Sequence, residues 1–133
     1  MKRIRVLLVD DHASFLRIVA QFLEDHDDIV VVGALDGATE ALARLDELAP
    51  DLVLMDLAMP GLPGLEAIPR VRAARPETVI IALTGLGTED YRAAALAAGA
   101  DEFIAKTSLG RELLPAIRRL ARLATGTVEG DAV

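Results

Sequence analysis

The stretch VLLVDDH, residues 6–12, joins a continuous apolar run to two adjacent carboxylates, Asp10 and Asp11. An unbroken apolar run of this length is typical of a strand that is covered on both faces, as in a parallel sheet. Two like charges at the end of such a strand repel each other, so the fold must neutralise or stabilise them. The stretch therefore predicts both a class of sheet and a polar site at one end of it.

Apolar runs of strand length recur along the chain, and apolar residues at helical spacing lie between them. Alternating strands and helices predict right-handed crossovers, with helices on both faces of a parallel sheet. We therefore expect an α/β fold, with one (βα)5 domain over residues 1–124 and a short mobile tail at 125–133. Pro69 and Pro115 fall inside two of the helical patterns, where each should kink its helix or delay its start. The expected strands are 4–9, 29–32, 52–55, 79–83 and 103–105, and the expected helices are 15–23, 38–45, 64–75, 88–98 and 108–124.

Composition limits the function classes. The 133 residues, 53% of them hydrophobic, suit one domain with a sizeable core. The absence of cysteine excludes disulfides and thiolate metal sites and fits a cytoplasmic protein. No apolar run has the length of a membrane-spanning helix, and Arg5 interrupts the first one, so we expect no signal peptide. The net charge of −7 provides no electrostatic footprint for nucleic acid.

Charged and hydroxyl side chains follow the predicted strands. Asp10 and Asp11 follow the first strand, Asp56 the third, Thr84 the fourth and Lys106 the fifth. Because the carboxyl ends of parallel strands meet at one edge of a sheet, we expect these side chains to converge there.

Three carboxylates gathered at one edge repel one another by about 4 kcal/mol per pair at about 4 Å and an effective dielectric of about 20. Either one carboxyl takes up a proton or a hard divalent cation binds, and oxygen ligands favour Mg²⁺ or Mn²⁺. Such a site suits phosphoryl transfer. Asp56, alone at the end of the central strand, is the expected nucleophile. Asp10 and Asp11 would hold the cation, and Thr84 and Lys106 the phosphoryl oxygens.

Four separated motifs occur in an order that resembles the response-regulator receiver domains of bacterial two-component systems. The likeness covers about residues 4–124, and it implies a flavodoxin-like sheet of strand order 2-1-3-4-5. Two further segments, VDDH (9–12) and VVGALDGATEAL (31–42), are similar to receivers that usually carry a helix-turn-helix output domain. The four motifs are LLVDDH (7–12), DLVLMDLAMPGLPGLEAI (51–68), VIIALTG (79–85) and GADEFIAK (99–106).

The resemblance also implies roles for individual residues. Phe103 stands where the family places a rotating aromatic, more often Tyr, so a switch formed with Thr84 would act by packing alone. In the family a Pro often follows the Lys at this position, but here the residue is Thr107. Whether the peptide bond between Lys106 and Thr107 is cis is therefore left open. The resemblance implies that Asp56 is the phosphoacceptor, that Asp11 is a direct metal ligand, that Asp10 is a ligand through water, and that the backbone carbonyl of Ala58 is the third ligand. It implies that Thr84 and Lys106 bind the phosphoryl group and that Gly85 is the small position beside it. Ala58 and Leu86 lie at positions that tune dephosphorylation in the family.

The predicted function is a phosphorylation switch rather than a turnover enzyme. A sensor histidine kinase or histidine phosphotransferase would donate the phosphoryl group. The face formed by 88–98, 103–105 and 108–124 would then change and contact a downstream protein or a second copy, without direct binding to DNA or membrane. An aspartyl phosphatase would carry a second Asp at position 58, where this chain has Ala58. A flavin binder would need a phosphate loop and aromatics, of which there are 3%. A fragment of a longer DNA-binding regulator stays open.

The remaining polar residues have plainer explanations. We expect His12 to be a partly exposed residue at a helix start and His26 to face solvent. Four arginines near the C-terminus form either a solvated helix face or a partner surface: Arg111, Arg118, Arg119 and Arg122.

Overall fold

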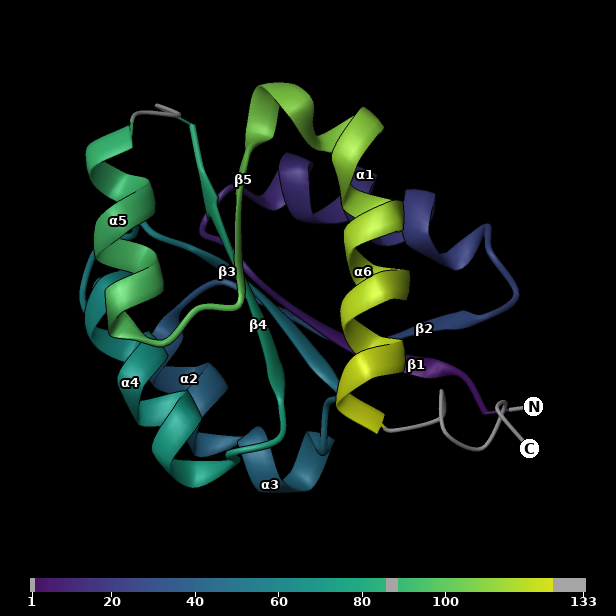
Figure 1. Ribbon diagram of the computed structural model, residues 1–133, viewed down its shortest axis with the longest axis horizontal. Coiled ribbons are helices and arrows are strands. Elements are labelled where there is room, and N and C mark those ends of the chain that lie inside the picture. The colour runs from purple at the N-terminus through teal and green to yellow at the C-terminus, as the bar shows by residue number, and fades with distance from the viewer. Residues whose placement is uncertain (1, 86–88, 126–133) are drawn as a thin grey trace.

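The computed structural model describes residues 2–85 and 89–125. Within them the strands form one parallel sheet of five strands in the order β2-β1-β3-β4-β5, as predicted (Figure 1). The order reverses between β1 and β3, which makes the carboxyl edge at this point the expected ligand site of such a sheet. The strands are β1 (Ile4–Val9), β2 (Ile29–Leu35), β3 (Leu52–Asp56), β4 (Val79–Thr84) and β5 (Glu102–Ala105).

Helices cover both faces of the sheet, with α1 and α6 on one side and α2, α4 and α5 on the other (Figure 1). Successive strand residues point to opposite faces, so that Ile80 packs in one core and Ile81 in the other. This two-sided burial is the physical reason why the strands are continuously apolar. The helices are α1 (Ala13–Glu24), α2 (Ala38–Ala43), α3 (Leu45–Leu48), α4 (Gly64–Ala74), α5 (Glu89–Ala98) and α6 (Leu109–Thr125), with a 3-10 turn η1 (Lys106–Ser108) before α6.

Several boundaries differ from those predicted. The expected helix 38–45 is broken at Arg44, which leaves the helical region and separates α2 from α3. Of the two alternatives given for the prolines, a delayed helix start is wrong, because α4 and α6 begin at Gly64 and Leu109 and contain Pro69 and Pro115. The expected tail begins within α6, and residues 126–133 lie outside the described part. Among the described helices, none is long and apolar enough to cross a bilayer.

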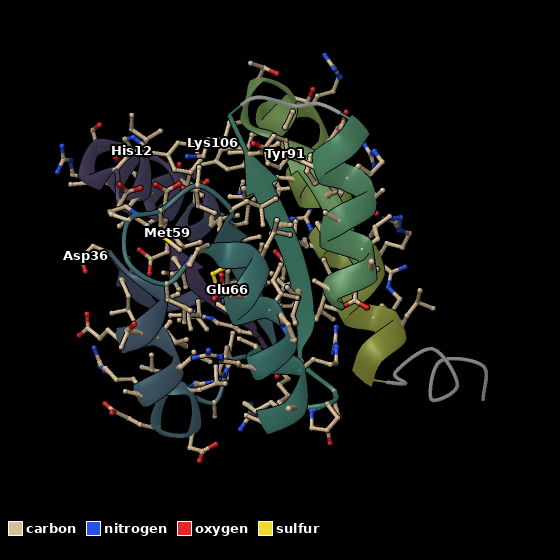
Figure 2. All side chains as sticks on the ribbon, turned by 90° about the vertical axis from the view of Figure 1, so that its left-hand side faces the viewer. His12, Asp36, Met59, Glu66, Tyr91 and Lys106 are labelled. Atoms are coloured by element: carbon tan, nitrogen blue, oxygen red, sulfur yellow. The ribbon has the colours of Figure 1, made fainter. Side chains whose placement is uncertain are left out.

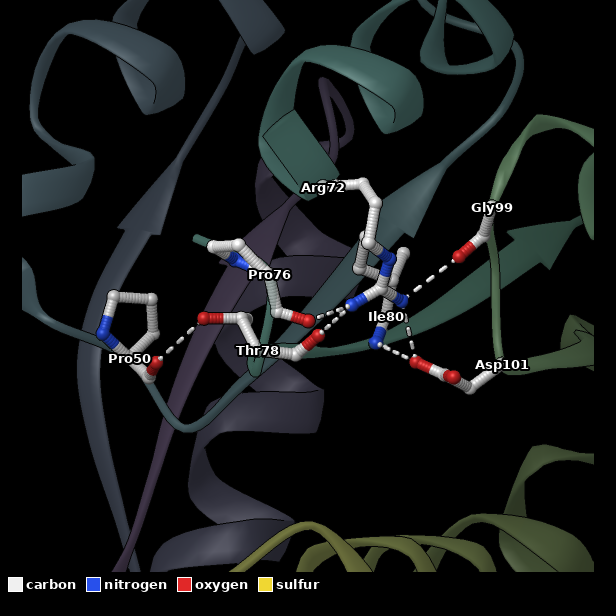
Figure 3. A network of polar contacts seen from close by, with 7 residues as sticks. All are labelled: Pro50, Arg72, Pro76, Thr78, Ile80, Gly99 and Asp101. Atoms are coloured by element: carbon white, nitrogen blue, oxygen red, sulfur yellow. Dashed lines mark hydrogen bonds and ion pairs between the residues drawn. The ribbon is translucent and has the colours of Figure 1, made fainter. Parts of the chain in front are cut away.

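A polar network at the amino edge of the sheet ties α4 to the last two strands (Figure 3). The guanidinium of Arg72 donates to the carbonyls of Pro76 at 2.9 Å, Thr78 at 2.6 Å and Gly99 at 2.8 Å, and pairs with Asp101 at 2.8 Å. The same carboxylate accepts the backbone N–H of Ile80, in β4, at 2.8 Å. This network lies at the opposite edge from the polar strand ends, and no pattern in the sequence indicated it.

Arg118, one of the four arginines expected on a solvated face or a partner surface, donates two hydrogen bonds of 2.9 and 3.1 Å to Asp28 and joins α6 to the start of β2. This hydrogen bonding holds the pKa of Asp28 below its ordinary value of 3.8. A carboxyl with a depressed folded-state pKa contributes stability that is present above the unfolded-state value and is lost as pH falls through the folded-state value.

We therefore expect Asp28→Asn to lower the free energy of unfolding at pH 7 by about 0.5–1 kcal/mol, since the pair is partly exposed. The difference from the parent chain should shrink as pH falls below about 4. Urea unfolding at pH 7 and pH 3 measures it, with Asp27→Asn as the matched control at an exposed neighbour. An equal loss at both pH values would remove the ion pair as the cause.

Candidate functional site

The polar strand ends meet at the carboxyl edge of the sheet. Asp10 follows β1, Asp56 is the last residue of β3, Thr84 is the last residue of β4, and Lys106 follows β5 directly. Asp10 and Asp56 are each 1% exposed and Thr84 is 2% exposed. In Figure 2, the labelled residues His12 and Lys106 mark this edge, and Met59 lies on the loop beside it. The predicted convergence is therefore observed.

Lys106 forms the cationic side of this cluster. Its Nζ lies 2.6 Å from Asp10 Oδ2 and 3.6 Å from Asp56 Oδ1, and the Lys106 side chain is 18% exposed. The ammonium is therefore closer to the carboxylate after β1 than to the expected nucleophile. Both distances leave it within reach of a group bound to Asp56.

His12 also belongs to the cluster, which was not expected. Its backbone N–H donates to Asp10 Oδ1 at 2.9 Å, and its ring Nδ1 lies 3.0 Å from the same oxygen and 3.4 Å from Asp11 Oδ1. One potential ligand atom from each of Asp10, Asp11, His12 and Asp56 falls within 4.8 Å of the others. The signal for this contact was present in the sequence, because His12 directly follows the acidic pair.

Three carboxylate oxygens are buried and accept no hydrogen bond: Asp10 Oδ2, Asp11 Oδ1 and Asp56 Oδ2. The contact of Asp10 Oδ2 with Lys106 is an ion pair without hydrogen-bond geometry. Buried carboxylate oxygens without a donor, as at Asp11 and Asp56, are costly, and a hard divalent cation would satisfy them. The donor set of oxygens therefore fits Mg²⁺ or Mn²⁺.

The pKa of Asp56 is raised above its ordinary value, first by burial and then by the negative charge of Asp10. The charge of Lys106 and a backbone hydrogen bond from Ala58 lower this pKa without cancelling the increase. The site is therefore short of positive charge around Asp56, which is the condition under which a cation stabilises it.

Gly64 allows α4 to pack directly behind Asp56, and no pattern in the sequence indicated this role. It begins α4, and a Cβ built there would lie 2.3 Å from the backbone carbonyl oxygen of Asp56 and 2.8 Å from Leu57 Cα. Only a residue without a side chain allows α4 to pack this closely on the end of β3.

The other expected site residues lie as follows. Phe103 is 2% exposed and already packed in the core, with the Arg92 guanidinium 4.9 Å from its ring centroid. No peptide bond in the described ranges 2–85 and 89–125 is cis, so the bond from Lys106 to Thr107 is trans. Ala58 is exposed on the loop after β3, Gly85 is exposed after β4, and Leu86 lies outside the described residues.

A sequence model described as the response regulator receiver domain matches residues 6–118. The chain belongs to this family. The receiver is 38% identical over 121 residues to the response regulator protein VraR of Staphylococcus aureus. That alignment covers 90% of the receiver but 57% of VraR, so the chain spans little more than half the length of this relative.

Solved structures agree with this assignment. The receiver superposes with a TM-score of 0.85 on a LuxR-family two-component response regulator from Aurantimonas sp. SI85-9A1, at 31% identity and covering 90% of this chain and 86% of that one. The signal receiver domain of the putative response regulator NarL from Mycobacterium tuberculosis also has a TM-score of 0.85, at 29% identity and covering 92% and 98%. The receiver thus belongs to two-component signalling, and its acidic cluster is consistent with a Mg²⁺ site.

Proposed function

We propose that this receiver accepts a phosphoryl group on Asp56 and thereby switches its contacts with other proteins. The observation that carries the proposal is the cluster of buried Asp10 and Asp56 with partly buried Asp11, with the ammonium of Lys106 3.6 Å from Asp56. A carboxylate poised beside a cation site and an ammonium suits attack on phosphorus.

The transfer begins when an oxygen of the Asp56 carboxylate attacks the phosphorus of a phosphohistidine. An oxygen–phosphorus bond forms, the phosphorus–nitrogen bond breaks, and its electron pair leaves with the imidazole, which takes up a proton. Lys106 and the Thr84 hydroxyl hold the phosphoryl oxygens. Asp10, Asp11, Asp56 and the backbone carbonyl of Ala58 would hold Mg²⁺ or Mn²⁺, which supplies charge neutralisation for the transferred group.

Phosphorylation adds about −1.5 to −2 charges at the carboxyl edge, and the response must come from an element with two arrangements. Thr84 moves toward the phosphoryl group, and Phe103 repacks in the space between β5 and α5. The face made by α5, β5 and α6 then binds a downstream protein or a second copy. Phe103 is already buried, with the Arg92 guanidinium 4.9 Å from its ring centroid, so its part in the switch would be a change of packing against α5 rather than an inward rotation.

The donor is a sensor histidine kinase or a histidine phosphotransferase, and the protein works in the cytoplasm. Membership of the receiver family supports a phosphoacceptor that assists only its own phosphorylation and dephosphorylation. An aspartyl phosphatase is disfavoured, because exposed Ala58 brings no acid to the loop after Asp56. The alternative role, as the receiver part of a longer DNA-binding regulator, is supported by segments 9–12 and 31–42, which resemble receivers that usually carry a helix-turn-helix output domain.

Incubation with phosphoramidate and Mg²⁺ tests the proposal directly. Intact-mass spectrometry should show one added phosphoryl group, and borohydride trapping followed by peptide mapping should locate it at Asp56. The label should not form when EDTA replaces Mg²⁺, because the buried oxygens then lack their cation. Equal labelling with and without a divalent cation, or a label at another carboxylate, contradicts the proposal.

A further inference from the structure

Lys106 has a third neighbour besides its two carboxylates. Its Nζ lies over the ring of Phe15, 4.2 Å from the ring centroid. Phe15 belongs to α1 and is partly buried against the core formed by α1, α6 and the sheet. The ammonium thus contacts residues at the carboxyl ends of β1 and β3 and a residue of a helix on one face of the sheet.

This contact is favourable and restrictive at once. A cation over an aromatic face within about 6 Å of the centroid is attracted by the ring quadrupole, most strongly where water is displaced. A lysine side chain has large rotamer freedom, which the ring contact reduces. Core packing explains why position 15 is apolar, but it does not explain why a ring lies under the ammonium.

We propose that Phe15 is a positioning residue for Lys106. Its ring holds the ammonium over the acidic cluster, where it meets the oxygens of a phosphoryl group on Asp56. The consequence for phosphorylation rests on the role proposed above for Asp56, whereas the ring–ammonium contact itself does not. Phe22 offers a matched control, because it is also partly buried on α1 but packs at an edge against His26, with centroids 5.4 Å apart.

Lysine NMR tests the contact itself. The chain has only two lysines, Lys2 and Lys106, so a sample with ¹³C-labelled lysine gives two ε-methylene signals. The ring current of Phe15 should shift the Lys106 signal upfield of Lys2. The shift should disappear in Phe15→Leu and persist in Phe22→Leu. A Lys106 signal unchanged by Phe15→Leu would overturn the inference, whether or not Asp56 accepts a phosphoryl group.

Beryllofluoride binding in Mg²⁺ tests the consequence, with titration calorimetry as the measurement. Pentafluorophenylalanine keeps the shape of the ring but reverses its quadrupole, so a purely structural role would not respond to it. At position 15 it should weaken binding by about 2-fold to 30-fold, the range of a cation–π contact, and at position 22 it should change nothing.

The outcomes separate the two proposals. Failure of the unsubstituted chain to bind beryllofluoride or to accept a phosphoryl group would sink the proposed function and leave the NMR test of Phe15 standing. Normal binding by the unsubstituted chain together with equal effects at positions 15 and 22 would sink the positioning role of Phe15 alone.

Discussion

Asp56→Asn is expected to reduce phosphoryl labelling of the receiver by at least about a hundredfold, because the amide is a far weaker nucleophile than the carboxylate. The substitution conserves shape, and Asp56 is 1% exposed at the end of a central strand, so the fold should be retained. The measurement is intact mass after incubation with phosphoramidate and Mg²⁺. Asp36→Asn, at an exposed carboxylate outside the acidic cluster, is the control and should label as the parent does.

The same variant has an expected effect on stability that a mere loss of function would not produce. Burial and the charge of Asp10 make ionised Asp56 unfavourable, as the raised pKa of this carboxyl indicates. A neutral amide removes that repulsion, so Asp56→Asn should be more stable than the parent in EDTA. Mg²⁺ should stabilise the parent more than the variant, because the variant lacks one charged ligand. Lower stability of the variant in EDTA would contradict this account of the cluster.

Gly64→Ala adds only one methyl group near the site, and we expect it to lower the free energy of unfolding strongly. The added Cβ would lie 2.3 Å from the carbonyl oxygen of Asp56, and a backbone atom cannot rotate away as a flexible side chain can. Either α4 or the end of β3 must shift, and overpacking of this kind costs about 1–3 kcal/mol, occasionally more. The shift also displaces the Asp56 backbone, so labelling should slow.

Urea unfolding measures this effect, with Gly110→Ala as the control. Gly110 lies near the start of α6 with no atom within 4 Å of its built Cβ. Alanine there should stabilise the chain by up to about 1 kcal/mol through helix propensity. If both glycine variants unfold at the same urea concentration, close packing of α4 on β3 is not what requires glycine at position 64.

The fold could be predicted because the local pattern of apolar and polar residues along the chain determines its strands and helices. The central strands are covered on two faces and therefore read as continuous apolar runs, as in 6–9 and 79–83. Topology alone then places the residue at or just after the end of each strand at the carboxyl edge of the sheet. For this reason the sequence could predict that Asp56 and Lys106 lie close together. The strand order itself was implied by the family resemblance and is confirmed.

Other features depend on distances that no local pattern contains. The break of the second helix at Arg44, the inward packing of Phe103 and the joining of Arg72 to Asp101 follow from how whole elements meet. The sequence places the acidic cluster and Lys106 at one edge because strand ends are fixed by chain order. Only the tertiary structure decides that Lys106 lies against Asp10 and the ring of Phe15, and that position 64 has no room for a side chain, because packing between distant segments sets side-chain direction and space.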